Sequence, residues 1–430
     1  MFVEISNQPR DYAWGMTGAI STLIGSGGAC LGEGDNAIEA ELWLGAHHGS
    51  PSRIGSARMG ESDGAGAASD ETLAELIARD PVGTLGPGFG ESARLPFLMK
   101  VLAAAEPLSL QVHPNLDQAR AGFEAEEAAG VPIDAPNRNY RDRFHKPELI
   151  VALSDQFHAL AGFRPIDESA RILSDFASVT AGERRNALMI LAGRMATVSP
   201  GAEAALLADV VSQQLTGGSD ALLDAVLEAS AAIIDADADA RGSVRAETLS
   251  AARTVRDTSA HHPRDRGVVV AALMNRVELR RGEAIALGAG RIHAYLRGIG
   301  IEVMAASDNV LRGGLTPKHI DTAELMRVLD ASPMLPPRLE PVRLAEGVIE
   351  FAPGAPEFRL LVVTGPKAIV DIDGPAIALA LGGPREIIGQ SGRVPLDSGD
   401  ACFITPDENR LRVTGSGELF IATTGQRDTP

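Results

Sequence analysis

The stretch VELRRGEAIAL, residues 277–287, returns later in the chain as VPLDSGDACFI, residues 394–404. Both copies fit the pattern V-x-L-x-x-G-[DE]-A-x-x-[LI], at a constant offset of 117 residues that leads from Val277 to Val394. Apolar residues that alternate on either side of a glycine turn predict a strand, a tight turn and a second strand. Because this unit occurs twice, we expect two related β-domains.

The two copies differ at one chemically important position. Carried through the same offset, His293 of the first copy falls on Arg410 of the second. An imidazole can bind a metal ion, whereas a guanidinium has no lone pair to offer. If the chain holds a metal, we expect it in the first β-domain.

A helical segment interrupts the strands. From about residue 164 to 258, apolar pairs recur at helical spacing, and the segment has no His and no Lys. A chain of 430 residues is long enough for two or three domains. The expected fold is therefore mainly β, with a first β-domain at residues 1–160 and 263–330, a helical insert at 161–262 and a second β-domain at 331–430.

Two helix starts can be placed from capping signals. SDETLAELIARDP, residues 69–81, predicts a helix with Ser69 or Asp70 as its N-cap and Pro81 beyond its end. Further on, Thr180 followed by Glu183 fits a capping box at the start of a helix of the insert.

Composition excludes several classes of partner. The formal charge of -18 argues against nucleic acid and anionic membrane surfaces, and no apolar run approaches the roughly 18 residues of a membrane span. The N-terminus lacks the order of a signal peptide, so we expect a cytoplasmic protein. Cys30 and Cys402 are then expected to be buried thiols and not a disulfide.

The usage of basic residues suggests where an anion would bind. Of 39 basic residues only four are lysines, Lys100, Lys146, Lys318 and Lys367. Such a chain is expected to keep lysine where a compact, flexible ammonium is needed.

Three stretches collect polar residues on predicted strands. In LSLQVHPN, residues 108–115, alternation puts Ser109, Gln111 and His113 on one face. In FHKPELIVAL, residues 144–153, Lys146 and Glu148 share a side at the mouth of an apolar strand, with His145 on the other side. The third stretch, residues 288–321, adds six candidates: His293, Tyr295, Glu302, Asp308, Arg312 and Lys318.

Taken together, these residues contain a ligand set. Gln111, His113, Glu148 and His293 offer one amide oxygen, two imidazoles and a carboxylate, which suits one Zn²⁺ or another borderline divalent ion. Lys100, Lys146, Arg312 and Lys318 would pair with an anion, and His145, Glu302 and Asp308 could move protons. Taken alone, Gln111 with His113 also fits a solvated polar face, and Lys146 with Glu148 fits a simple ion pair.

The three stretches resemble the signatures of type I phosphomannose isomerases. The resemblance rests on LPFLMKVLAAAEPLSLQVHPN, on HKPEL and on HAYLRGIGIEVMAASDNVLRGGLTPKHID, with YAWG and ELWLGAH near the start. It implies two cupin-type jelly-roll β-domains with an inserted α-helical domain, and zinc on the four ligands named above. Its implied substrate and catalytic positions are Lys100, Ser109, Lys146, Glu302, Asp308, Arg312 and Lys318; we add Tyr295 as a substrate contact and His145 as a catalytic candidate.

The activity implied by this resemblance is the interconversion of mannose 6-phosphate and fructose 6-phosphate, which supplies mannose for activated-mannose synthesis. A proton would move between C2 and C1 through a cis-enediol, with Zn²⁺ as a Lewis acid. Glu302, Asp308 and Lys146 stay open as the base. Arg312 would hold the developing anion, His145 would help to open the sugar ring, and lysines would bind the phosphate.

Two alternatives and two departures accompany this hypothesis. A non-catalytic sugar-phosphate sensor would bind metal without exchanging the sugar's hydrogens, and a cupin-type oxygenase would have little use for the cations. The family usually has a basic residue where this chain has Met16, and a His-Pro where it has His47-His48. These departures concern the phosphate loop and leave the ligand set unchanged. We expect a monomer.

Overall fold

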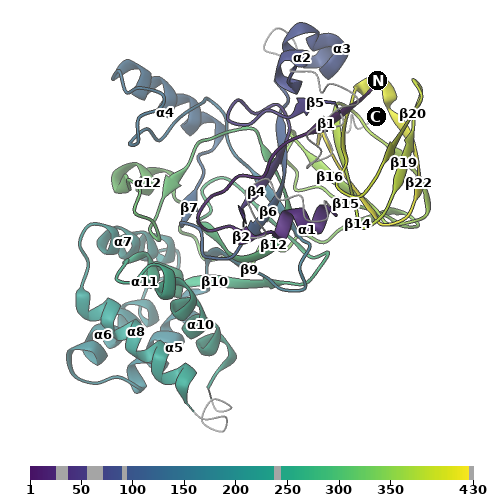
Figure 1. The fold of residues 1–430 in the computed structure, drawn as a ribbon. Coiled ribbons are helices and arrows are strands. Elements are labelled where there is room, and N and C mark those ends of the chain that lie inside the picture. Colours follow the sequence, from purple (N-terminus) through teal and green to yellow (C-terminus); the bar gives the residue numbers. More distant parts are fainter. Residues whose placement is uncertain (26–36, 56–70, 90–93, 237–243, 426–430) are drawn as a thin grey trace.

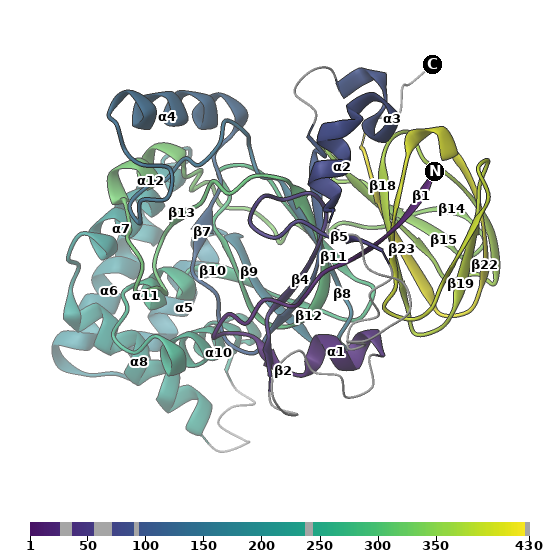
Figure 2. The same ribbon diagram turned by 45° about the horizontal axis from the view of Figure 1, so that its top comes forward.

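The computed structural model describes residues 1–25, 37–55, 71–89, 94–236 and 244–425. The fold is β-rich with several helices. Three regions follow one another across the molecule: a helical block, a central β-region and a β-region built mostly from the last hundred residues (Figures 1 and 2). No helix in the described ranges has the length and apolar character needed to cross a membrane.

The central β-region is a nine-stranded sheet in which the long strand β12 is the hub, since it pairs with β6, β7, β8 and β9. The sheet consists of β4 (Glu41–Leu44), β6 (Phe97–Ala104), β7 (Gln111–Val112), β8 (Glu148–Ala152), β9 (Phe157–Phe163), β10 (Met274–Leu279), β11 (Ala284–Leu287), β12 (His293–Ala305) and β13 (Leu311–Arg312). A two-stranded ribbon of β2 (Met16–Thr17) and β3 (Ile38–Glu39) accompanies it.

The other β-region contains two sheets. The larger one has eight strands in the order β14 (Val342–Ala345), β15 (Val348–Phe351), β16 (Arg359–Val363), β23 (Glu418–Thr423), β18 (Ala376–Leu381), β21 (Ala401–Ile404), β1 (Phe2–Ser6) and β5 (Arg53–Ile54). The smaller one has four strands in the order β17 (Lys367–Asp371), β22 (Arg410–Gly415), β19 (Arg385–Ile388) and β20 (Arg393–Leu396). The first strand of the chain thus belongs to a sheet that is otherwise formed mainly by its last hundred residues.

The sequence repeat has the predicted strand-turn-strand structure. Its first copy forms β10 and β11 around Gly282, whose φ is +83°, and its second forms β20 and β21 around Gly399, whose φ is +94°. Glycine adopts this left-handed backbone without the penalty that a Cβ brings. The equivalence extends further, because His293 and Arg410 are the first residues of β12 and β22.

The helical block agrees with the predicted segment. It contains α5 (Ile166–Ser178), α6 (Gly182–Ala196), α7 (Glu203–Leu215), α8 (Asp220–Asp235), α10 (Ala246–His261) and α11 (Gly267–Ala272). Its apolar faces share one core with the end of β9, where Phe163 is fully buried. The remaining helices of the described residues are α1 (Ala19–Ile24), α2 (Leu73–Arg79), α3 (Pro81–Leu85), α4 (Leu116–Ala128) and α12 (Thr322–Val328), with short 3-10 turns at Pro87–Phe89 and Pro406–Glu408.

Both predicted helix caps were wrong. Helix α2 is capped by Thr72, whose hydroxyl accepts from the N–H of Glu75 while Glu75 accepts from the N–H of Thr72. This reciprocal pair satisfies two free donors, which fixes the start after residues 69 and 70; these two lie outside the described ranges. Helix α6 begins after Ala181, since the hydroxyl of Thr180 donates back to carbonyls at the end of α5. Pro81 lies beyond the end of α2, as predicted, and it is also the first residue of α3.

The predicted thiol chemistry can be checked at one of the two cysteines. Cys402 is free and fully buried, and burial raises the pKa of its thiol to about 12. Cys30 lies outside the described residues.

Candidate metal centre and cavity

Strand register brings the predicted polar residues together from distant parts of the chain. Gln111 of β7 stands directly opposite His293 of β12 on one side and Arg312 of β13 on the other. Residues directly opposite one another in antiparallel strands project to the same face. The three side chains therefore emerge together, although 201 positions separate the first from the last.

A second register places the carboxylates. On β12, Glu302 is opposite Lys100 of β6, and Met304 is opposite Glu148 of β8. Since Glu302 and Met304 are two residues apart, they point to the same side of β12. The face that carries Lys100 therefore also carries Glu148.

His113, Glu148 and His293 form a tight, buried cluster. The Nε2 of His113 lies 3.2 Å from one oxygen of Glu148, and the Nε2 of His293 lies 3.1 Å from the other. All three side chains are at most 4% exposed. In both imidazoles Nδ1 faces a backbone carbonyl oxygen, of Asn309 at 2.7 Å and of Arg291 at 2.9 Å, and must therefore donate its hydrogen to that oxygen.

This tautomer leaves the centre of the cluster without a proton. Burial lowers the pKa of His113 to about 4, so its ring is neutral and, with its single hydrogen on Nδ1, presents a lone pair at Nε2. That atom is buried and has no hydrogen-bond partner among the residues that the structure describes. Lone pairs that face a carboxylate at about 3 Å repel one another unless a cation lies between them. Metal-bound histidines donate their other N–H to a carbonyl or carboxylate in the same manner, so the cluster fits a divalent cation.

A short loop holds this centre in place. The side chain of Asn309 accepts from the N–H of Arg141 and donates to the carbonyls of Asp142 and Phe144. The backbone oxygen of Asn309 receives the Nδ1–H of His113. One buried asparagine thus joins the loop before Glu148 to the ring of His113. Asn309 lies within the stretch of residues 288–321, but no local pattern there indicates this role.

A cavity of about 280 Å³ adjoins the cluster. Of the predicted residues it is lined by Lys100, Lys146, Asp308, Arg312 and Lys318. Lys146 connects the two, because its Nζ lies 3.0 Å from Glu148. The cavity also contains residues that the sequence analysis did not select, among them Tyr12, Glu41, Asn139 and Arg141.

Three basic side chains in the cavity lining have no acidic partner within the described residues. Arg141, Arg312 and Lys318 have no carboxylate within ion-pair distance among the residues that the structure describes. They are close enough to disfavour one another's charged forms: burial and then Arg141 lower the pKa of Arg312, and burial followed by Arg312 and Arg141 lowers the pKa of Lys318. Three mutually repelling cations in a cavity create a site for an anion.

Lys100 is engaged differently from these cations. Its Nζ lies 3.1 Å from Glu302 and 3.3 Å from Glu41, and it sits over the ring of Trp43. Although burial opposes the charge, the carboxylates hold the pKa of Lys100 above its ordinary value. Burial raises the pKa of Glu302, while Lys100 counteracts it. Lys100 therefore serves as the counter-ion of two buried carboxylates.

Asp308 faces the cavity as an ionised group. The N–H of Gly49 donates to Nδ1 of His47, which leaves the hydrogen of a neutral His47 on Nε2, 3.3 Å from Asp308. Nε2 of His48 lies 3.5 Å from the other carboxylate oxygen. Burial opposes ionisation, but His47, Lys146 and His48 lower the pKa of Asp308 to about 2. The departure at His48 thus adds a second partner for this carboxylate.

Four of the predicted catalytic and substrate residues are not among those that line the cavity: Glu302, Tyr295, Ser109 and His145. Glu302 is buried and paired with Lys100. Tyr295 is buried against Phe157, and burial beside Glu302 raises the pKa of its phenol well above the ordinary value. Ser109 precedes β7 and is half-buried. His145 turns toward the C-terminal region, where its Nε2 lies 2.6 Å from Glu357.

Comparisons with known proteins point to one family. Residues 2–166 match the family described as phosphomannose isomerase type I, catalytic domain. The mannose-6-phosphate isomerases of Salmonella typhimurium and Escherichia coli are both 34% identical, over 97% of this chain and 98% of their own. A zinc-bound crystal structure of mannose 6-phosphate isomerase matches with a TM-score of 0.81 and 31% identity, covering 99% of this chain and 100% of the other. Because the identity with whole relatives exceeds 30% over nearly the full length, and the segment matched by the family contains β6, β7 and β8, the chain belongs to the type I phosphomannose isomerase family.

Proposed function

We propose that this protein interconverts mannose 6-phosphate and fructose 6-phosphate and that it requires zinc. The observation that carries this proposal is the cluster of two imidazoles and a carboxylate, which fits a cation, next to a cavity whose unpaired basic side chains fit an anion. A phosphosugar offers hydroxyl and carbonyl oxygens at one end and a phosphate at the other. Membership of the family supports the same activity.

The proposed zinc ligands are Gln111, His113, Glu148 and His293. The register of β7 against β12 supports the inclusion of Gln111, because it faces the side on which His293 emerges. Bound at these residues, zinc supplies a Lewis acid for the oxygens at the reacting end of the sugar. Lys146, 3.0 Å from Glu148, adds an ammonium that can donate to the same oxygens.

We assign the phosphate to Arg141 and Lys318, with Arg312 between the phosphate and the reacting carbons. The position of Arg312 opposite Gln111 supports this order, since it lies next to a zinc ligand and repels Arg141. From there its guanidinium can stabilise the negative charge that develops on the sugar. Lys100 and Lys146 are already paired with carboxylates, which makes them weaker candidates for the phosphate.

For the proton transfer between C2 and C1 we favour Asp308 among the three residues left open by the sequence. Asp308 lines the cavity and is ionised, so it can accept a proton from one carbon and return it to the other. Glu302 is paired with Lys100, and Lys146 is paired with Glu148. His145, bound to Glu357, receives no role in this assignment.

The division of the chain into domains is also proposed. We interpret residues 1–160 and 263–330 as a catalytic cupin-type jelly roll, 161–262 as an inserted helical domain and 331–430 as a second, degenerate jelly roll. The equivalent strand pairs around Gly282 and Gly399 support a common origin of the two β-domains. The pairing of β1 with β21 implies that the first strand was exchanged into the second β-domain. We expect a cytoplasmic monomer that binds no nucleic acid.

A coupled assay for fructose 6-phosphate, combined with hydrogen exchange, tests the proposed function. The zinc-loaded protein should form fructose 6-phosphate from mannose 6-phosphate and exchange deuterium at C1 or C2. Arg312→Gln should lower turnover while zinc is retained, whereas His113→Gln should lose both. A sensor would bind the metal and the phosphosugar without product or exchange, and that result would refute the proposal.

A further inference from the structure

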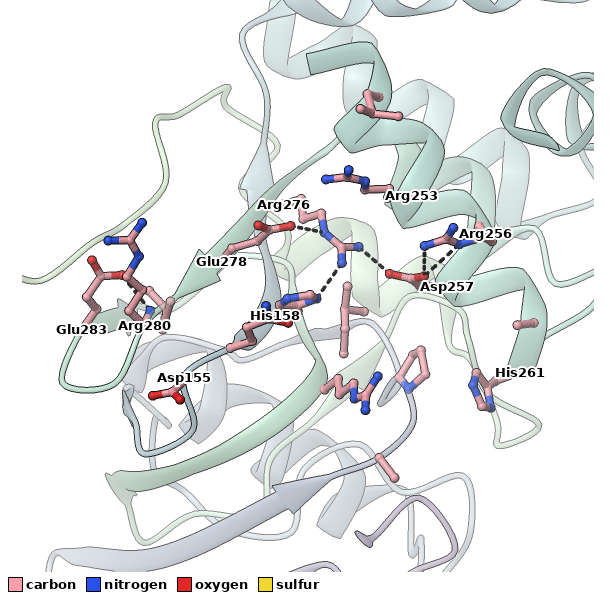
Figure 3. A pocket seen from close by; sticks show the side chains of 18 of the residues that line it. Asp155, His158, Arg253, Arg256, Asp257, His261, Arg276, Glu278, Arg280 and Glu283 are labelled. Atoms are coloured by element: carbon pink, nitrogen blue, oxygen red, sulfur yellow. Dashed lines mark hydrogen bonds and ion pairs between the residues drawn. The ribbon is translucent and has the colours of Figure 1, made fainter. Parts of the chain in front are cut away.

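A second cavity, of about 1150 Å³, lies where α10 meets the outer side of the central sheet (Figure 3). One wall is formed by residues of β9, β10 and β12, and the other by α10 and the end of α8. It shares no lining residue with the catalytic cavity and has about four times its volume. It is therefore a separate site that could hold a larger ligand than a sugar monophosphate.

The lining of this junction cavity is basic in a strongly acidic chain. Six arginines face it, namely Arg253, Arg256, Arg276, Arg280, Arg297 and Arg338, together with two histidines. Its four carboxylates are Asp155, Asp257, Glu278 and Glu283. This local excess of basic side chains attracts an anion to the cavity, although the net charge of the chain is -18.

Part of this charge is already balanced at the floor of the cavity. Arg276 is only 3% exposed and is held by Asp257 at 2.8 Å, by Glu278 at 3.1 Å and by Nδ1 of His158 at 2.7 Å. Arg338 lies 3.0 Å from Glu283. Three of the four carboxylates in the lining are therefore already engaged in ion pairs.

The floor of the cavity presents one N–H group with a fixed direction, that of His158. A guanidinium has only donors, so Nδ1 of His158 accepts from Arg276, and the ring hydrogen of a neutral His158 must be on Nε2. Burial, followed by the charge of Arg276, lowers the pKa of His158, which keeps the ring neutral. No acceptor for Nε2 is found in the described part of the chain.

Arg297 joins His158 on the same wall. The register of β12 against β9 shifts between Tyr295 and Arg297, and after this shift Arg297 is opposite His158. Tyr295 is buried inside the sheet, whereas Arg297 is exposed and lines the junction cavity. The bulge thus directs Arg297 outward beside His158.

Arg253 faces these groups from the helical block. Figure 3 shows its side chain extending from α10 on the side of the cavity where Arg276 lies. Within the described ranges, neither Arg253 nor Arg297 has a carboxylate at ion-pair distance. Leu249, Leu279 and Leu296 add an apolar part to the lining, which suits the organic part of a ligand.

We propose that the junction cavity binds an organic phosphate of nucleotide size, with the phosphate between Arg253, Arg297 and the Nε2–H of His158. Guanidinium groups bind phosphate oxygens through paired charge-assisted hydrogen bonds and also stack on planar rings. The apolar side chains then contact the base or sugar. This proposal does not depend on the assignments made for the catalytic cavity.

The test is calorimetric titration of the zinc-loaded full-length protein with ADP. An equilibrium mixture of mannose 6-phosphate and fructose 6-phosphate is kept at saturation to fill the catalytic cavity. One ADP per chain should bind, and both Arg253→Gln and Arg297→Gln should weaken the affinity by about tenfold or more. Arg410→Gln removes the same charge from an exposed site in β22 and should bind ADP like the parent.

Further titrations show which part of ADP the cavity binds. Adenosine should not bind, and inorganic phosphate should bind more weakly than ADP and compete with it. Zinc content and isomerase constants should be equal in all variants, which shows that they are folded and that ADP does not act by removing the metal. The proposal is overturned if ADP does not bind, if the phosphosugars displace it, or if the Arg253 and Arg297 variants bind like the parent.

Discussion

Replacing Lys100 with methionine tests whether this residue is a counter-ion of the buried carboxylates. Its Nζ lies between Glu302, 3% exposed, and Glu41, 9% exposed. Methionine fills a similar volume but leaves both carboxylates without their cation. Removal of one partner from a buried ion pair costs about 3 to 5 kcal/mol, because the remaining charge is desolvated. We expect a loss in this range at pH 8.

The loss should depend on pH in a definite direction. Burial already raises the pKa of Glu302, and Lys100 opposes that shift, so its removal raises the pKa of Glu302 further. A carboxyl with a folded pKa above the unfolded value binds a proton more readily when folded. The loss of unfolding free energy in Lys100→Met is therefore small below the pKa that Glu302 has in the unfolded chain. It grows as the pH rises through the pKa that Glu302 has in the folded protein.

Urea unfolding of the variant at pH 5 and pH 8 measures this deficit. Lys367→Met is the matched control, since Lys367 is exposed in β17, and it should change the unfolding free energy by no more than about 0.5 kcal/mol. Adding Glu302→Gln to Lys100→Met should restore much of the stability. If Lys100→Met costs no more than the control, or if its deficit does not change with pH, the counter-ion assignment is wrong.

Three further predictions concern Asp308, Phe163 and Cys402. In metal-free protein, Asp308→Asn should lower the free energy of unfolding by about 2 kcal/mol at pH 6, because the folded pKa of Asp308 is lowered to about 2. This stabilisation is present above the unfolded pKa and is lost as the pH falls toward 2. An equal deficit at pH 6 and pH 3 in urea unfolding would contradict this prediction. Phe163→Ala should lower the free energy of unfolding by about 3 to 5 kcal/mol, since Phe163 is fully buried where β9 meets the helical core, and a loss below 1 kcal/mol would show that this junction is not tightly packed. In a Cys30→Ser background, Cys402 should resist thiol reagents at pH 8 until the protein unfolds, because burial raises its pKa to about 12; rapid modification of the native protein would refute this.

The sequence predicted best those features that depend on local patterns. The strand-turn-strand repeat follows from alternation around Gly282 and Gly399, and the helical block follows from apolar spacing; both were confirmed. The predicted N-cap of α2 was wrong because several residues that favour an N-cap follow one another within a few positions. Only the reciprocal hydrogen bonds of Thr72 and Glu75 decide between them. Nothing local in Phe2–Ser6 indicates that this strand pairs with Ala401–Ile404.

The candidate site was predictable where a residue's chemistry is rare in the chain. Histidines on strands suggested His113 and His293, and the described cluster contains both. Arg141 was missed because one arginine among 35 carries no signal, although its place beside Arg312 makes it a candidate for the phosphate. The partners of Lys100 could not be predicted either, since Glu41 reaches it only through the pairing of β4 with β6.

The most direct test of the proposed function is a zinc titration of the metal-free protein. Protein freed of metal by a chelator should be inactive in the coupled assay for fructose 6-phosphate. Activity should then rise in proportion to added zinc and level off at one zinc per chain, with Glu148→Gln failing to recover at the same zinc concentration. Full activity without metal, or no fructose 6-phosphate from mannose 6-phosphate at any zinc content, would contradict a zinc-dependent isomerase.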